Sequence, residues 1–239
     1  MKIGIIYAMK KEMKAYYYAF KKLKKIQSSI YGINIYVSHS NKIFFIQSGI
    51  GKVSSSIACT ILIYIYKVNI IINIGSSGTL KSYININDVI IGSKIAYHDV
   101  NVTSFNYTVG QIPGFPKIFN TNNFLRNQIK TILYNYNITF WEGLIVSGDT
   151  FINHNNHINN ITNNFTDIIA LDMESAAINQ VCFQHNIPVL IIKIISDFAT
   201  ETAPSIFKKN IKNLYLKLYN IIHDYIQIIQ TCSKIITYV

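Results

Sequence analysis

The chain alternates short apolar runs with segments in which apolar residues recur at helical spacing. The apolar runs are rich in isoleucine and short, as buried strands are. We interpret as strands Lys2–Tyr7, Ile33–Ser38, Ile43–Ser48, Asn69–Ile74, Asp88–Ile91, Gly143–Ser147, Ile168–Leu171 and Pro188–Ile195. We interpret as helices Lys10–Lys25, Val53–Tyr66, Leu125–Tyr136, Glu174–His185 and Phe207–Ile229.

Buried strands that alternate with helices predict an α/β fold, in which helices cover the faces of a mostly parallel sheet. The 239 residues contain no repeat or low-complexity linker, so we expect residues 1–239 to form a single domain. The most apolar stretch, 57–74, is interrupted by Lys67, Asn69 and Asn73, which favours a buried helix and strand over a membrane span. The start of the chain lacks the pattern of a secretory signal, and we expect a cytoplasmic protein.

The formal net charge of +11 raises the possibility of nucleic-acid binding. Arg126 is the only arginine, however, and nucleic-acid-binding proteins usually use arginine on phosphates and guanines. The lysines are mostly scattered, so we do not expect a nucleic-acid partner. The three cysteines, Cys59, Cys182 and Cys232, form no close pair in the sequence, and we expect reduced, buried thiols.

Three carboxylates follow predicted buried strands, in a chain with eleven acidic residues against twenty-two basic ones. Glu12 follows the first strand, Glu174 opens a helix after a short strand, and Asp197 ends the last strand. Each has an ordinary alternative, first-turn helix chemistry for the glutamates and an N-cap for Asp197. In open α/β sheets, ligands bind beyond the carboxyl ends of the strands, so we expect the three carboxylates to share a ligand site.

Two glycine pairs, Gly49-Ile50-Gly51 and Gly75-Ser76-Ser77-Gly78, occur in the same zone, where glycine lets the backbone approach a ligand closely. Neither is a dinucleotide fingerprint or a P-loop. His154 and His157 lie close together, but the sequence places no third ligand near them. We therefore expect neither a metal nor an organic cofactor.

Several longer motifs resemble those of one known family. They are Met1–Ile6 with Ala8-Met9 and Glu12, Ser48–Val53, Ile71–Asn73 with Gly75-Ser76, Tyr97–Asp99, Gly143–Asp149 with Phe151–Asn153, Met173-Glu174, and Ile195–Asp197. In this order, and from Met1 to about Phe207, the chain resembles bacterial 5′-methylthioadenosine/S-adenosylhomocysteine nucleosidases.

The resemblance implies a nucleoside phosphorylase-like three-layer α/β fold, with a central mixed β-sheet flanked by helices. It also implies hydrolysis of the N-glycosidic bond of 5′-methylthioadenosine and S-adenosylhomocysteine, and of 5′-deoxyadenosine as a further substrate, in methionine salvage. Glu12 would then activate water, Glu174 would bind the ribose hydroxyls, and Asp197 would protonate adenine N7. These roles suit a reaction that develops positive charge on the ribose and negative charge on adenine.

The resemblance further implies which residues bind the substrate. Phe151 would stack on adenine, the backbone of Ile152 would meet the base, and Met173 would lie beside the ribose. The same pocket would be lined by Met9, Ile50, Ser76, Gly78 and Phe207.

The apolar segment 105–116 indicates a homodimer, because so apolar a loop is not expected to face water. By resemblance, Phe105, Tyr107 and Pro113 would reach the alkylthio end of the substrate in the partner subunit. The alternative is a loop folded back on its own core.

The chain departs from the family pattern at Tyr7, Ser77, Thr79, Asp172 and Lys193, and these departures bear on pocket fit and rate rather than on the reaction. Alternatives are a purine nucleoside phosphorylase of the same fold, a hydrolase of AMP or futalosine, and a non-catalytic adenosine-binding protein. An assay for free adenine would separate an enzyme from a binding protein.

Overall fold

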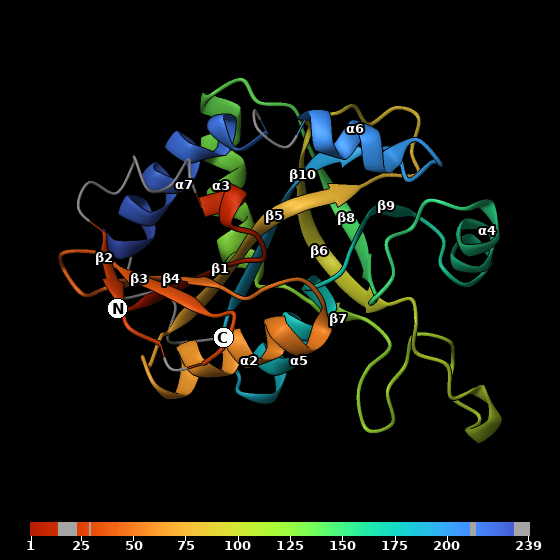
Figure 1. The fold of residues 1–239 in the computed structure, drawn as a ribbon, viewed down its shortest axis with the longest axis horizontal. Coiled ribbons are helices and arrows are strands. Elements are labelled where there is room, and N and C mark those ends of the chain that lie inside the picture. Colours follow the sequence, from red (N-terminus) through yellow and green to blue (C-terminus); the bar gives the residue numbers. More distant parts are fainter. Residues whose placement is uncertain (14–22, 29, 211–213, 232–239) are drawn as a thin grey trace.

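A mixed sheet of ten strands organises the residues that the computed structural model describes, which are 1–13, 23–28, 30–210 and 214–231 (Figure 1). The strands are β1 (Ile3–Tyr7), β2 (Lys24–Ile26), β3 (Asn34–Val37), β4 (Ile43–Gln47), β5 (Ile70–Gly78), β6 (Val89–Tyr97), β7 (Phe119–Asn120), β8 (Phe140–Ser147), β9 (Ile168–Asp172) and β10 (Val189–Asp197). The helices are α2 (Lys52–Tyr64), α3 (Asn123–Asn135), α4 (Asn155–Asn164), α5 (Ser175–Gln184), α6 (Ala203–Asn210) and α7 (Leu214–Thr231), with a short 3-10 helix at Thr103–Phe105.

The sheet contains two groups of parallel strands, β4-β1-β5-β10 and β6-β8-β9, which pair antiparallel with each other. Strand β1 pairs in parallel with β4 and β5, and β5 pairs in parallel with β10. Strand β10 also pairs with β6, which leads through β8 and β9 back to β5 at the pair Gly78–Leu171. The strands β5, β10, β6, β8 and β9 therefore close into a ring, which brings the carboxyl ends of β5, β9 and β10 together.

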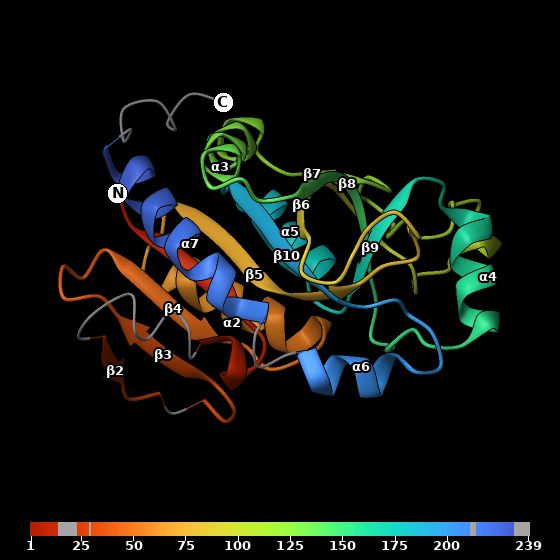
Figure 2. The same cartoon turned by 90° about the horizontal axis from the view of Figure 1, so that it is seen from above.

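Helices cover both faces of the sheet, which confirms the predicted three-layer fold. Helices α2 and α5 lie together on one face, and α3 and α7 lie on the other (Figures 1 and 2). One core cluster joins Leu125 and Ile129 of α3 to Ile222 and Tyr225 of α7 and to β1, β5 and β10. A second joins α2 and α5 to the opposite face, and a smaller one packs beneath α4. Burial of these apolar side chains is what holds the layers together.

All eight predicted strands are present, but β5, β6 and β8 are several residues longer than the pattern indicated. We expected a strand to end at Ile74, yet β5 continues to Gly78, because β10 pairs with it up to Asp197. Strand β6 runs on to Tyr97 along β8, and β8 begins at Phe140. Pairing with a neighbour thus extends strands through polar and glycine residues that locally predict a break.

The predicted helix Lys10–Lys25 is partly wrong. Residues 10–13 are helical and 14–22 lie outside the described residues, but Lys24–Ile26 form the edge strand β2, which pairs with β3. Its two lysines are exposed, as is common where an edge strand avoids pairing with other chains. The predicted helix Phe207–Ile229 is two helices, α6 and α7, and residues 211–213 between them lie outside the described residues. Helix α4 was not predicted, because its sequence is dominated by asparagine.

Cys59 of α2 and Cys182 of α5 are buried and free, with their Sγ atoms 3.7 Å apart, whereas Cys232 lies outside the described residues. Within the described residues, no helix is both long and apolar enough to cross a membrane.

Tyr225 tests how α7 is attached to the sheet. Its side chain is fully buried, and its hydroxyl donates a 3.1 Å hydrogen bond to the carbonyl oxygen of Leu125 at the start of α3. Tyr225→Phe should lower the free energy of unfolding by about 1–2 kcal/mol in urea titration, because the buried hydrogen bond between Tyr225 and Leu125 is lost. Tyr134→Phe is the control, since Tyr134 is exposed, and it should change stability by less than about 0.5 kcal/mol. Equal effects of the two substitutions would contradict this account of α7.

Candidate active site

The carboxyl ends of β5, β9 and β10 and the turn after β1 enclose a pocket of about 150 Å³. The closed ring of strands brings these ends together, so residues far apart in the sequence face one space. The pocket is lined by Ala8, Met9, Glu12, Ile50, Ile74, Gly75, Ser76, Ser77, Gly78, Phe151, Leu171, Asp172, Met173, Glu174, Lys193, Ser196, Asp197 and Phe207. All three carboxylates singled out in the sequence are among them.

Glu12 is held in the pocket by backbone amides. The amides of Ala8 and Met9 each donate a 2.8 Å hydrogen bond to its Oε2, and the amide of Ser76 donates one of 3.3 Å to its Oε1. The residue is 1% exposed. The bonds to Ala8 and Met9 are the expected first-turn helix chemistry, but the bond to Ser76 ties the carboxylate to the end of β5, inside the pocket.

Glu174 precedes α5, but its side chain makes no capping bond to that helix. Its Oε1 instead accepts a 3.1 Å hydrogen bond from the amide of Gly51, which precedes α2. The side chain is nearly buried, and this burial raises its pKa to about 7, against the opposing effect of the nearby Lys193 ammonium. A buried carboxylate directed away from its own helix is not explained by capping, which favours a role in the pocket.

Asp197 is the last residue of β10 and is 2% exposed. The hydroxyl of Ser196 donates a 2.7 Å hydrogen bond to Oδ2, and the amide of Ala199 donates one of 3.0 Å to Oδ1. Burial raises its pKa despite these two hydrogen bonds. It is not an N-cap, because the next helix, α6, begins only at Ala203. A carboxyl group that retains its proton more readily than usual can act as a proton donor.

Apolar side chains form another part of the pocket lining. The rings of Phe151 and Phe207 lie 6.3 Å apart and edge to face, and Met9 and Ile50 line the wall. Ile152 does not line the main pocket but a small adjoining recess of about 30 Å³, together with Phe151. Flat aromatic walls beside buried carboxylates suit a ligand that joins a planar ring to a polar group.

Three predicted substrate-binding residues lie away from this pocket. Phe105, Tyr107 and Pro113 belong to the segment between β6 and β7, which extends away from the sheet in Figure 1. Phe105 is 74% exposed, and none of the three lines the pocket. Within one chain, the structure therefore does not bring them to the site.

A polar network that the sequence analysis did not assign holds the loop carrying Phe151. The ammonium of Lys52 lies 2.6 Å from Asp99, whose Oδ2 accepts a 3.0 Å hydrogen bond from the amide of Asp149. Asp149 in turn accepts a 2.8 Å hydrogen bond from the amide of Lys52. Both aspartates directly follow strand ends, β6 and β8, so the rule that selected Glu12 could also have found them.

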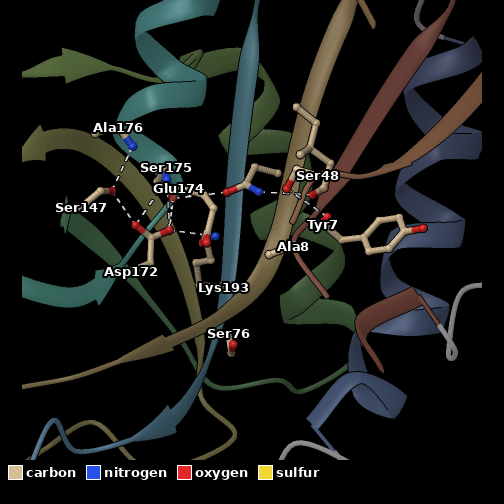
Figure 3. Close-up of polar contacts among 12 residues, drawn as sticks. Tyr7, Ala8, Ser48, Ser76, Ser147, Asp172, Glu174, Ser175, Ala176 and Lys193 are labelled. Atoms are coloured by element: carbon tan, nitrogen blue, oxygen red, sulfur yellow. Dashed lines mark hydrogen bonds and ion pairs between the residues drawn. The ribbon is translucent and has the colours of Figure 1, made fainter. Parts of the chain in front are cut away.

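Asp172 and Lys193, noted in the sequence only as departures from a family pattern, form a buried ion pair at the back of the pocket (Figure 3). No group of three or more His, Cys, Asp or Glu side chains able to hold a metal ion occurs among the described residues.

Comparison with known proteins gives consistent results. A family model described as the phosphorylase superfamily matches residues 2–227. A 5′-methylthioadenosine/S-adenosylhomocysteine nucleosidase of Buchnera aphidicola subsp. Acyrthosiphon pisum (strain Tuc7) is 46% identical over 218 residues, 88% of this chain and 91% of that protein.

Two solved structures are similar to this chain over almost their whole length. The nucleosidase of the same name from Neisseria meningitidis, in complex with methylthio-immucillin-A, has a TM-score of 0.89 at 30% identity, covering 95% of this chain and 98% of that one. The futalosine hydrolase of Helicobacter pylori strain 26695 also has a TM-score of 0.89, at 26% identity, covering 95% and 97%.

The ring of strands and the carboxylate-lined pocket at its end thus define a phosphorylase-superfamily protein. Within that superfamily, the chain belongs to the family of the 5′-methylthioadenosine/S-adenosylhomocysteine nucleosidases.

Gly51 tests the close packing behind Glu174. It has a positive φ of 96°, and a Cβ atom there would lie 2.8 Å from Oδ1 of Asp149. Gly51→Ala should lower the free energy of unfolding by about 1–3 kcal/mol more than Gly114→Ala, because both strain the backbone and only the first adds a clash. Gly114 has a similar φ of 81°, and nothing lies within 4 Å of an added Cβ. Equal losses in thermal or urea unfolding would show that the contact with Asp149 is not tight.

Proposed function

We propose that this chain hydrolyses the N-glycosidic bond of 5′-methylthioadenosine and S-adenosylhomocysteine, with Glu12, Glu174 and Asp197 as its working carboxylates. The observation that carries the proposal is the meeting of these three buried side chains in one pocket beside Phe151. The named activity of the relatives, at up to 46% identity over most of the chain, supports the same substrates. The product would be free adenine and the 5-substituted ribose.

Cleavage of this bond leaves positive charge on the ribose ring and places negative charge on the base. Fixed groups that already match these charges lower the barrier, because the pocket does not reorganise during the reaction. Glu12 is fixed by three amides and is the best placed to hold and deprotonate the attacking water. Its bond to the amide of Ser76 keeps it at the end of β5, where a ribose would lie.

Asp197 supplies the proton to the leaving base in this proposal. Gly78 lies directly in front of it, since a Cβ at that position would be 2.9 Å from Oδ1 of Asp197. A planar base can therefore approach the carboxyl group closely, with Phe151 over one face. Protonation at adenine N7 neutralises the charge that bond cleavage delivers to the base.

Glu174 is the proposed acceptor for the 2′ and 3′ hydroxyls of the ribose, beside Met173. The amide of Gly51 occupies one lone pair of Oε1, and the remaining lone pairs are available to donors in the pocket. A buried carboxylate that loses its partner is costly, so such a site selects against a 2′-deoxy sugar.

Water is the proposed nucleophile rather than phosphate. Among the described residues that line the pocket, Lys193 is the single cation, and Asp172 pairs with it. Arg126, the only arginine of the chain, pairs with Glu142 and does not line the pocket. A phosphate dianion beside Glu12 would be repelled, which favours hydrolysis over phosphorolysis.

The proposed working unit is a homodimer in the cytoplasm. Ile112 and Phe115 of the segment between β6 and β7 pack against the second core cluster, but Phe105 and Pro113 remain exposed. A second copy would cover these side chains and would bring Phe105, Tyr107 and Pro113 over its partner's apolar pocket wall at Met9, Ile50 and Phe207. An apolar closure there suits methylthio, homocysteinyl and unsubstituted 5′ groups, the last being that of 5′-deoxyadenosine.

Glu12→Gln should nearly abolish adenine release from 5′-methylthioadenosine, since the amide keeps the shape but cannot deprotonate water. Adenine is measured by chromatography, with and without inorganic phosphate, and the wild type should yield the same free thioribose in both. Near-wild-type release from the variant would refute the role of Glu12, and a ribose 1-phosphate product would refute hydrolysis.

Asp197→Asn should lower kcat by on the order of a hundredfold or more, because the amide has no proton to give. The raised pKa of Asp197 gives the sign of the pH dependence: wild-type activity should fall as pH rises through that pKa and the proton is lost. The asparagine variant should lack this alkaline fall. A wild-type profile with no group lost on the alkaline side would remove Asp197 from this role.

Pro113→Asp should weaken both self-association and substrate binding, because it places a charge in the proposed shared wall. Light scattering and KM are measured together, and Lys117→Asp on the same segment is a control for charge alone. A wild type that is fully active as a monomer would refute the dimer, and loss of only one property would refute the shared pocket.

A further inference from the structure

A fully buried ion pair lies against the pocket, outside the three proposed catalytic carboxylates. Nζ of Lys193, in the middle of β10, is 2.8 Å from Oδ2 of Asp172 at the end of β9, and both side chains are 1% exposed. Removing two charges from water is costly, and an apolar pair could fill the same space without that cost. A buried ion pair at this place therefore needs a further explanation, and its neighbours supply one.

Asp172 is fixed by more than its partner. The hydroxyls of Ser147, at the end of β8, and of Ser175, at the start of α5, donate hydrogen bonds to it, and so does the amide of Ser175 (Figure 3). The hydroxyl of Ser147 also accepts a 2.9 Å bond from the amide of Ala176. Two elements, β8 and α5, thus hold one carboxylate in a single orientation, which in turn fixes where the ammonium of Lys193 lies.

The ammonium of Lys193 lies beside the carboxylates that face the substrate. A Cβ atom at Gly75 would be 3.4 Å from Nζ of Lys193 and 3.2 Å from Oε1 of Glu12, so both groups approach the same point of β5. Glu174 lines the same wall, two residues after Asp172. Three buried carboxylates, Glu12, Asp172 and Glu174, therefore surround one buried ammonium.

These charges together influence the pKa of the Glu174 carboxyl group. The groups that face it are Lys193 of β10, Asp172 of β9 and Glu12 after β1, with the amide of Gly51 before α2. The pKa of Glu174 is raised to about 7, chiefly by burial; the charges of Asp172 and Glu12 also raise it, whereas Lys193 and the hydrogen bond from Gly51 lower it. The same carboxylates outweigh burial at Lys193 and raise its pKa, so the ammonium keeps its proton.

We propose that Lys193 and Asp172 are a pair of positioning residues, in which Asp172 anchors the ammonium of Lys193 beside Glu12 and Glu174 so that both carboxylates act on the nucleoside as anions. This inference rests on the proposed function, because it assigns the pair a task in binding the ribose and activating water. Neither residue needs to touch the substrate. The pair sets the pH range in which the pocket carries the charge that the reaction requires.

The test is the acidic limb of the pH dependence of kcat/KM, which reports protonation of Glu174 in the free enzyme. Lys193→Met removes the cation with little change of shape, so the limb should move to higher pH by roughly one unit or more. Asp172→Asn removes the negative charge that opposes Glu174, while the amide oxygen can still accept a hydrogen bond from Lys193 and hold its ammonium in place, so the limb should move to lower pH. Shifts of opposite sign are an electrostatic signature that a loss of packing does not produce.

Two further variants serve as controls. Lys193→Arg keeps the charge and should leave the limb near its wild-type position, even if the larger side chain slows turnover. Lys130→Met removes a lysine from the surface ion pair with Glu142 and should leave the limb unchanged. If Lys193→Met does not fold, as judged by circular dichroism, Asp172→Asn still tests the predicted direction in which the acidic limb shifts. Limbs that stay in place in both Lys193→Met and Asp172→Asn, while rates fall equally at every pH, would overturn the proposal.

A binding measurement separates this proposal from the proposed function. The pH dependence of Kd for 7-deaza-5′-methylthioadenosine, measured by calorimetry, should show the same shifts without any turnover. If the wild type releases no adenine but these Kd profiles shift as stated, the proposed hydrolysis is refuted and the positioning role of Lys193 and Asp172 is supported. If adenine is released and neither the Kd nor the kcat/KM profiles of the variants shift, the positioning role of Lys193 and Asp172 is refuted and the proposed hydrolysis is supported.

Discussion

Four nearly buried carboxylates and one buried ammonium line a single pocket, and much of the structure serves to make that arrangement possible. Each buried charge must be matched by a counter-charge or by hydrogen bonds, or it becomes neutral. The protein uses both means. Backbone amides at the ends of strands and before helices hold Glu12 and Glu174, whereas Asp172 and Lys193 neutralise each other. The sheet determines where these donors lie.

The closure of the strands into a ring brings several of these groups to one place. Strand β5 contributes the amide of Ser76 and the bare backbone of Gly75 and Gly78, and β10 contributes Lys193 and Asp197. The two strands pair in parallel along most of their length, so their polar ends arrive together. The apolar residues earlier in each strand are buried alternately in the two core clusters, so both strands are held between the two helix layers.

One physical reason explains why Gly75 and Gly78 line the pocket: each leaves room that a side chain would fill. A side chain at Gly75 would lie against Glu12 and Lys193, and one at Gly78 would lie against Asp197. Each glycine therefore leaves room beside a charged group that lines the pocket. The departures at Asp172 and Lys193 also fit together in the structure, since a short acid and a long amine meet at 2.8 Å with no exposed surface.

The sequence by itself determined the layers and indicated the candidate site carboxylates, because strand periodicity and the rule of carboxyl ends are local properties. Glu12, Glu174 and Asp197 could be selected in this way, and the structure brings them into one pocket. The sequence alone could not determine that β5 continues to Gly78, since that depends on pairing with β10. Nor could it show that Lys24–Ile26 pair with β3, that Lys193 meets Asp172, or that Glu174 accepts a bond from Gly51. These contacts join residues far apart in the chain, and only the folding of the sheet brings their partners within reach.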